Sequence, residues 1–295
     1  DTGTGDHNAS FPIDLTITKR RVSGASTYVM TRLTGDKYLR TNATSAESSF
    51  NFDNLFDDMT GVDFTGGSGW YDTSDTIGWM WKRAPGYFDV VAYQGTGSAG
   101  FTFNHNLGVK PEMIWVKNRG AAEYWAVYHK DLNGGTNPSH YFLKLNGTDA
   151  ETDYNEIWND TEPTATQVTV GQQGVVNSSS FSHIAYLFAT VAGVSKVGSY
   201  TGNGSSSGPT VDCGFSGSPR FVLIKKATGG TGSWYVFDSV RGIVAGAESQ
   251  LYLNSTAAEQ TATDQIDPTS SGFQIVINSG GLNTNGETYI FYAIA

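Results

Sequence analysis

The chain has 295 residues, a formal net charge of −10, 36 glycines and 13% aromatic residues. The acidic balance argues against nucleic acid as a partner, because phosphates require a basic face, and against electrostatic docking on anionic membranes. The longest apolar run, Ile184 to Val194, is too short to span a bilayer, and the single cysteine, Cys213, excludes an intrachain disulfide. We expect Cys213 to be a small buried apolar residue.

Similar segments recur along the chain. The first matched feature of each is a strand that ends in a lysine, and the next is a Leu-x-[Thr/Leu]-Asn motif followed by Ala-Glu. The lysines are Lys19, Lys117 and Lys225, and the asparagines are Asn42, Asn146 and Asn254. The asparagines are 104 and 108 residues apart. A later strand contains Ile77, Ile184 and Ile290 at the same spacing. One period shared by several features indicates that a structural unit was copied three times.

A Gly-rich connector, 86–97, recurs as 193–204, and Thr2-Gly3-Thr4-Gly5 resembles its tail. We therefore expect the numbering to begin within a longer precursor. The connectors predict domains at residues 1–95, 96–203 and 204–295, of ordinary domain size, with the first repeat divergent.

The third repeat shows its elements most clearly. Alternating β-branched and aromatic residues predict the strands, and Gly-rich or Asn-Gly segments predict the turns. The strands are expected over residues 196–201, 220–226, 234–238, 250–254, 272–277 and 287–295. Thr256 to Glu259 could add one helical turn capped by Asn254 or Ser255. No long helical period is present, so the fold class is all-β: three tandem β-sandwich repeats of about 100 residues each. A barrel is the structural alternative.

Exposed aromatic residues are the candidate binding chemistry. Trp70 and Tyr71 lie in a Gly-rich loop, and Trp158 precedes Asn159-Asp160. An aromatic ring beside Asn and Asp suits stacking on a sugar, so these three residues form the predicted glycan-binding set. The alternative is burial at a domain or subunit interface.

Four aspartates of the first repeat, Asp53, Asp57, Asp58 and Asp63, are a candidate calcium site, because hard cations prefer several carboxylate oxygens. The EF-hand pattern is absent, and a solvated loop is the alternative.

No catalytic residues are predicted, and no cofactor. The five histidines do not pair at metal-ligand spacing, and neither a nucleophile elbow nor a Walker-type lysine loop is present. Seven Asn-x-Ser/Thr tripeptides fit local turn and capping bonds better than glycosylation. Their asparagines are Asn8, Asn42, Asn146, Asn159, Asn177, Asn203 and Asn254.

Six segments of the sequence resemble those of a known family. They are residues 111–119, 125–130, 158–161, 198–204, 234–238 and 251–259. They resemble an uncharacterised repeat domain of bacteriophage tail and virion proteins, especially marine ones, where it often forms the C-terminal part of longer chains. The resemblance covers about residues 10–295 and brings no catalytic residues. It implies a virion surface component: a tail fibre, an appendage or a capsid decoration protein.

Together these observations favour a non-enzymatic bacteriophage structural protein on the extracellular surface of the virion. Its expected partners are other virion proteins or copies of itself, in a homo-oligomer or lattice, with no nucleic acid or membrane. A glycan-binding adhesin of a viral or bacterial surface, which would bind a host-surface glycan in host attachment, is the alternative. A depolymerase is the third reading, although nothing in the sequence sets the carboxylate separation that it needs.

Overall fold

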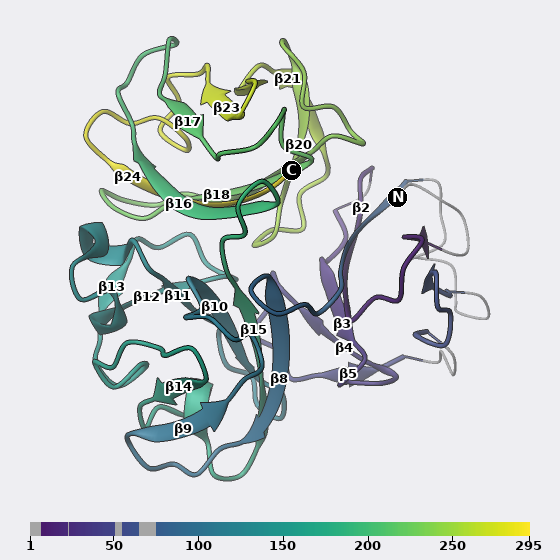
Figure 1. Ribbon diagram of the computed structural model, residues 1–295, viewed down its shortest axis with the longest axis vertical. Helices are drawn as coiled ribbons and strands as arrows, with labels where there is room; N and C mark the ends of the chain where they lie inside the picture. Colours follow the sequence, from purple (N-terminus) through teal and green to yellow (C-terminus); the bar gives the residue numbers. More distant parts are fainter. Residues whose placement is uncertain (1–6, 23, 51–54, 65–74) are drawn as a thin grey trace.

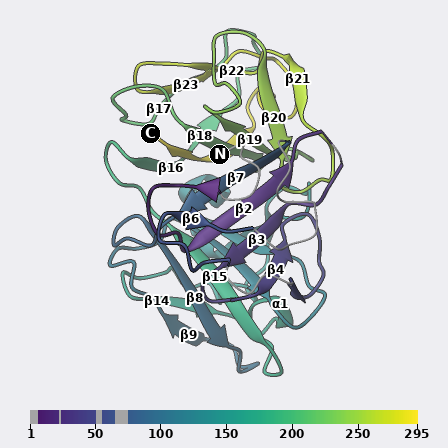
Figure 2. The same cartoon turned by 90° about the vertical axis from the view of Figure 1, so that its right-hand side faces the viewer.

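The computed structural model describes residues 7–22, 24–50, 55–64 and 75–295. Its strands are antiparallel, and they form three lobes around a common centre (Figure 1). We call residues 7–81 lobe 1, residues 88–188 lobe 2 and residues 195–294 lobe 3. The all-β prediction is confirmed. Figure 2 shows the sheet of lobe 1 with lobe 3 above it and β8, β9 and β14 of lobe 2 below it.

Each lobe contains one large sheet. In lobe 1 the strand order is β5 (Ser48–Ser49), β4 (Lys37–Arg40), β3 (Tyr28–Thr31), β2 (Leu15–Arg20) and β7 (Thr76–Trp81). In lobe 2 it is β13 (Thr152–Asp153), β12 (Tyr141–Lys144), β11 (Ala126–His129), β10 (Met113–Asn118), β15 (Ser182–Phe188) and β8 (Phe88–Gln94). In lobe 3 it is β21 (Gln260–Thr263), β20 (Glu248–Tyr252), β19 (Trp234–Asp238), β18 (Phe221–Lys226), β24 (Thr288–Ile294) and β16 (Ser195–Thr201).

A small sheet accompanies each large one. The small sheets are β1 (His7–Asn8) with β6 (Gly61–Val62), β9 (Phe101–Asn104) with β14 (Gln167–Val170), and β17 (Thr210–Asp212) with β23 (Gly272–Ile275) and β22 (Ile266–Pro268). The described helices are single turns in lobe 2: η1 (Leu132–Gly135), η2 (Pro138–His140) and α1 (Gly174–Asn177).

The residues matched along the sequence occupy one register position in all three large sheets. The cross-strand pairs are Lys19 with Ile77, Lys117 with Ile184, and Lys225 with Ile290. The strand order around these pairs is also the same, except that no described strand of lobe 1 corresponds to β8 and β16.

The large sheets are buried on both faces. Along β10, Met113 and Trp115 enter a central cluster, whereas Ile114 and Val116 enter a second cluster inside lobe 2. Residues of all three lobes contribute to the central cluster, and each lobe also has a cluster of its own between its large and small sheets. Each lobe is therefore a two-sheet unit, and the three units share one core.

The predicted domain boundaries at 95/96 and 203/204 need correction. β8 pairs with β15 and β16 pairs with β24, so each connector strand already belongs to the lobe that follows it. The chain crosses between lobes earlier, at residues 82–87 and 189–194. Gly86 and Gly193 take positive φ angles of 77° and 72° in these two crossings, which favours glycine.

Within lobe 3 the strand predictions hold for β16, β18, β19, β20, β23 and β24, with ends shifted by a few residues. The helical turn predicted over Thr256 to Glu259 is wrong, because this segment is not helical. Its backbone bonds to another lobe, as described below.

Candidate functional site

The repeated asparagines have the same local role in each lobe. Each side-chain Oδ1 accepts a hydrogen bond from a backbone N–H at the start of β3, β11 or β19. The pairs are Asn42 with Thr27 at 2.9 Å, Asn146 with Trp125 at 2.9 Å, and Asn254 with Trp234 at 2.8 Å. Three of the seven Asn-x-Ser/Thr tripeptides are thus explained by turn bonding inside the fold.

Five residues beyond each asparagine, the chain reaches the neighbouring lobe. The backbone N–H of a glutamate there donates to a carbonyl that follows a central strand of that lobe. The bonds run from Glu47 to Arg119 (2.8 Å), from Glu151 to Ala227 (2.8 Å) and from Glu259 to Arg21 (2.7 Å). These bonds connect lobe 1 to lobe 2, lobe 2 to lobe 3 and lobe 3 to lobe 1, so they form a closed ring.

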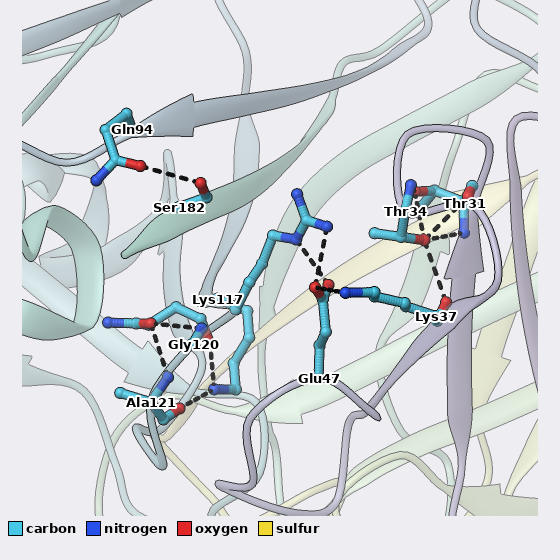
Figure 3. Close-up of polar contacts among 11 residues, drawn as sticks. Thr31, Thr34, Lys37, Glu47, Gln94, Lys117, Gly120, Ala121 and Ser182 are labelled. Carbon is cyan, nitrogen blue, oxygen red and sulfur yellow. Dashed lines mark hydrogen bonds and ion pairs between the residues drawn. The ribbon is translucent and has the colours of Figure 1, made fainter. Parts of the chain in front are cut away.

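We call the contact between two neighbouring lobes a seam. Side chains add further bonds at each seam, and these side chains differ between the three seams. At the seam of lobes 1 and 2, Arg119 donates to both carboxylate oxygens of Glu47 at 2.7 and 3.1 Å. Lys37 lies 3.6 Å from the same carboxylate (Figure 3). The side chains of Arg119 and Glu47 are only 18% and 13% exposed, so this ion pair is partly shielded from solvent.

At the seam of lobes 3 and 1, Arg241 has a fully buried side chain. Its guanidinium contacts Asp238 at 2.6 Å and Glu259 at 3.2 Å. Trp79 of lobe 1 donates its Nε1–H to Asp238 at 3.0 Å, and Arg241 lies over the Trp79 ring. The charged Asp238 and Arg241 of lobe 3 therefore contact the Trp79 ring of lobe 1.

At the seam of lobes 2 and 3, alanine replaces the arginine. Ala227 occupies the position that Arg119 and Arg21 occupy at the other seams. The Glu151 carboxylate instead accepts the backbone N–H of Asn133 at 2.9 Å. Burial raises the pKa of Glu151, opposed by that hydrogen bond. This seam has the backbone bond without an arginine partner for its glutamate.

Two tryptophans join lobes through their indole nitrogens. Trp125 donates to the carbonyl of Arg40 in lobe 1, and Trp234 donates to the carbonyl of Lys144 in lobe 2, both at 2.9 Å. Lobe 1 has Thr27 at this position. There Thr41 links the lobes, and its hydroxyl donates to the Leu253 carbonyl at 2.6 Å.

The repeated lysines Lys19, Lys117 and Lys225 are buried on the central face of their sheets, and the residues are 1%, 0% and 0% exposed. Lys19 donates to the Ser255 carbonyl of lobe 3 at 2.6 Å, and Lys225 to the Thr148 carbonyl of lobe 2 at 3.1 Å. Lys117 donates to carbonyls of its own lobe (Figure 3).

Burial lowers the pKa of Lys19 and Lys117 to about 8 and that of Lys225 to about 7. An amine with a lowered pKa can serve as a nucleophile. These amines are enclosed, however, and they donate to backbone carbonyls and, from Lys19, to the Thr27 hydroxyl at 3.2 Å. They are placed to hold the sheets together.

The predicted sugar-stacking role of Trp158 is wrong. The residue is 1% exposed and packs edge to face against Tyr128 inside the lobe 2 cluster, with ring centroids 6.0 Å apart. A ring enclosed in this way cannot stack on a ligand. Trp70 and Tyr71 lie outside the described residues, so their predicted role stays a prediction.

The calcium site also stays a prediction. Asp53 lies outside the described residues. Asp58 accepts the backbone N–H and the hydroxyl of Thr60, at 2.8 and 2.7 Å, as a local turn does. Asp57 is exposed and Asp63 half-buried. Among the residues that the structure describes, no three His, Cys, Asp or Glu side chains gather closely enough to hold a metal ion.

His129, His183 and Cys213 are also buried. Burial lowers the pKa of His129 to about 3, and a bond to the Phe291 carbonyl opposes this shift. His183 stacks on Tyr93. Cys213 is 5% exposed, as expected, and burial raises the pKa of its thiol to about 12, which makes it unreactive at neutral pH.

An open cleft of about 340 Å³ lies where lobes 2 and 3 meet. Lys130 and Asp131, just after β11, line one wall, and β17 lines the other, with residues 196–200 of β16 between them. Tyr200 and Phe291 also line the cleft but are 8% and 3% exposed, so the accessible surface is mainly polar.

The charges in this cleft are of both signs. Lys130 is paired with Glu112 at 2.7 Å. Burial raises the pKa of Asp131, opposed by the charge of Lys130, a hydrogen bond from Ser199 and the charge of Lys196. On the other wall, Asp212 accepts the Gly214 N–H at 2.8 Å, and this bond lowers its pKa. The cleft can therefore bind a polar ligand with donors and acceptors.

The fold and seams define a closed, three-lobed all-β protein. The chain belongs to the family described as a domain of unknown function, DUF7483, whose model matches residues 2–295. No curated protein and no solved structure matches the chain. None of the described helices is long and apolar enough to cross a membrane.

The sequence reasoning identified the positions of the seam residues but not their role. The lysines, asparagines and glutamates were visible as repeated landmarks, and a charged residue at the end of an apolar strand could have suggested a buried contact. The cleft gave no such signal, because Asp131, Ser199 and Asp212 are brought together only by packing between lobes.

Proposed function

We propose that the protein is a non-enzymatic structural component of a bacteriophage virion, a tail fibre, appendage or capsid decoration protein that acts through protein contacts at the particle surface. The observation that carries the proposal is the closed ring of backbone bonds between lobes. It closes a single chain into one three-lobed body, which suits a building block. The virion assignment itself rests on the sequence resemblance.

The distribution of reactive side chains supports contact over catalysis. The buried lysines bond to backbone carbonyls and a threonine hydroxyl, the buried histidines bond to or stack on other groups of the chain, and the thiol is enclosed. A catalytic site needs a nucleophile or acid–base pair that a substrate can reach. These groups are instead enclosed within the lobes or bonded between them.

Glycan binding is the weaker proposal, because Trp158 is buried and the cleft offers little exposed aromatic surface for stacking on a sugar. Binding on a glycan array that is lost in Trp70→Ala would favour it.

The test is to purify virions of a phage that encodes the chain and to label them with an antibody raised against it. We expect gold label at one fixed place on each particle, and a stoichiometric amount of the chain in washed particles. Absence of the chain from washed particles would overturn the proposal. So would polysaccharide cleavage by the purified chain, which would make it an enzyme.

A further inference from the structure

The strand β16 is the outermost strand of the lobe 3 sheet, and it runs along the cleft between lobes 2 and 3. The N–H of Gly202 donates to the Glu287 carbonyl at 2.9 Å. In an antiparallel pair the backbone N–H and C=O of every second residue face the partner strand, so this bond shows which residues of β16 face β24. The backbone groups of Lys196, Gly198 and Tyr200 therefore point to β24. Those of Val197, Ser199 and Thr201 point outward.

The outward groups of β16 are only partly used. The Val197 N–H donates to the Thr190 hydroxyl at 3.0 Å. Ser199 and Thr201 are exposed, and no residue in the described part of the chain bonds to their backbone N–H or C=O. An edge with free donors and acceptors is a template for another strand.

The walls of the cleft flank this edge on its two faces. Val197 lies in the central cluster and Tyr200 in the lobe 3 cluster, so side chains alternate between the faces. Ser199 shares the face of Val197, on the side of Asp131, whose pKa it helps to lower. Lys196 shares the face of Tyr200, where its charge acts on Asp212. Lys196 forms no ion pair with any described residue.

The geometry points to this edge as the acceptor of an extended peptide from a partner protein, added to the sheet as a further strand. An acidic side chain of the peptide meets Lys196 on one face. A basic or hydroxyl side chain on the next residue meets Asp131 on the other, because neighbouring residues of a strand point to opposite faces. The inference rests on the structural function proposed above and names its contact site.

The equivalent edge of lobe 2 is a built-in control. In β8, the Gly95 N–H donates to the Phe181 carbonyl, so Ala92 and Gln94 point outward as Ser199 and Thr201 do. Here, however, the place of Lys196 is taken by Asp89, which is already paired with Arg83 at 2.7 Å. The Gln94 side chain accepts a bond from the Ser182 hydroxyl at 3.0 Å (Figure 3) and donates to the Ser179 carbonyl at 3.0 Å. The chemistry for a charged peptide is absent.

The test uses the full chain as bait for a displayed library of random dodecapeptides, followed by affinity measurement on the enriched peptides. Ser199→Pro removes one outward N–H and leaves the bonds from β16 to β24 in place. We expect at least about a tenfold loss of affinity for Ser199→Pro and no change for Ala92→Pro on the control strand. Lys196→Glu should abolish the preference for acidic peptides.

Equal binding by Ser199→Pro and the unaltered chain would overturn the inference, as would a library that yields no binding peptide. Thermal melting checks that both proline variants fold, and Lys196→Glu alone decides if Ser199→Pro does not. If the proposed structural role is wrong, the unaltered chain is absent from washed particles. That result is separate from peptide binding, so a failure of the proposed function and a failure of this inference can be distinguished.

Discussion

The seam between lobes 1 and 2 and the seam between lobes 2 and 3 share one backbone bond and differ in their side chains. In both, a glutamate N–H donates across the seam at 2.8 Å. At the first seam Arg119 holds the Glu47 carboxylate with two hydrogen bonds, whereas Ala227 leaves Glu151 without such a partner. The backbone bond is common to all three seams, so it and the shared core define the closed arrangement.

The difference shows which parts of a repeated unit are free to vary. Each lobe must present a carbonyl and an N–H at the right place, and these belong to the backbone, which every sequence supplies. The side-chain ion pair adds stability at two seams. At the third, the neighbouring lobes leave a polar cleft beside β16. The seam without an arginine is thus also the one beside the proposed peptide site.

We expect the largest effect in the central cluster, to which residues of all three lobes contribute. Trp125→Ala removes a fully buried ring and its bond to Arg40 of lobe 1. We expect the free energy of unfolding to fall by about 3–5 kcal/mol. Urea unfolding should remain one transition for fluorescence and for circular dichroism, because the core is common.

The exposed Val22→Ala serves as the control, with a change within about 0.5 kcal/mol. Two transitions, of which the mutation moves one, would mean that the lobes are independent domains.

Lys225 should make stability depend on pH. Its pKa is about 7 in the folded protein, against about 10.4 in an unfolded chain. Between pH 8 and pH 10 the unfolded state therefore binds about one more proton, and stability rises with pH by about 1.4 kcal/mol per unit from this group. Above the pKa of the unfolded chain the lysine is neutral in both states, so it no longer makes stability depend on pH.

Replacement of Lys225 by methionine removes the titrating group and keeps an apolar stem of similar size. We expect the slope of unfolding free energy against pH in this window to fall by about 1.4 kcal/mol per unit. Val22→Ala, at an exposed position without a titratable group, should leave the slope unchanged. An unaltered slope in Lys225→Met would show that the lysine does not titrate in this range.

The asparagine bond is common to the three lobes and should have similar weight in each. Asn146→Ala leaves the Trp125 N–H without its acceptor, and we expect a loss of about 1–3 kcal/mol in unfolding free energy. Asn146→Asp keeps an acceptor oxygen and should recover most of the loss. Equal destabilisation by both replacements would contradict the assigned role.

Much of the sheet structure could be predicted from sequence. Apolar alternation marked β18, β19 and β24, and the repeat aligned Lys225 and Ile290 with their equivalents in the other lobes. Their pairing across two strands was not predicted and comes from the structure. The helical turn at Thr256 to Glu259 could not be resolved in this way. Its Ala-rich sequence favours a helix locally, but the Glu259 N–H bonds to Arg21 in another lobe, and this tertiary bond requires an extended chain.

The candidate sites were less accessible to sequence reasoning. Trp158 beside Asn159-Asp160 has the composition of a sugar site, yet the ring turns inward against Tyr128. Composition does not report which face of a loop a side chain occupies. The cleft depends on the contact between lobes 2 and 3, and no local pattern predicts that Asp131 lies near Ser199.

The smallest expected effects distinguish the two seams directly. Glu47→Gln removes the charge that Arg119 binds through two hydrogen bonds, and we expect a loss of about 1–2 kcal/mol, reduced at high salt. Glu151→Gln should cost less than about 0.5 kcal/mol, because an amide oxygen can still accept the Asn133 N–H. Urea unfolding at low and high salt compares the two variants. Equal losses would mean that the arginine adds nothing to the stability of its seam beyond the backbone bond and the shared core.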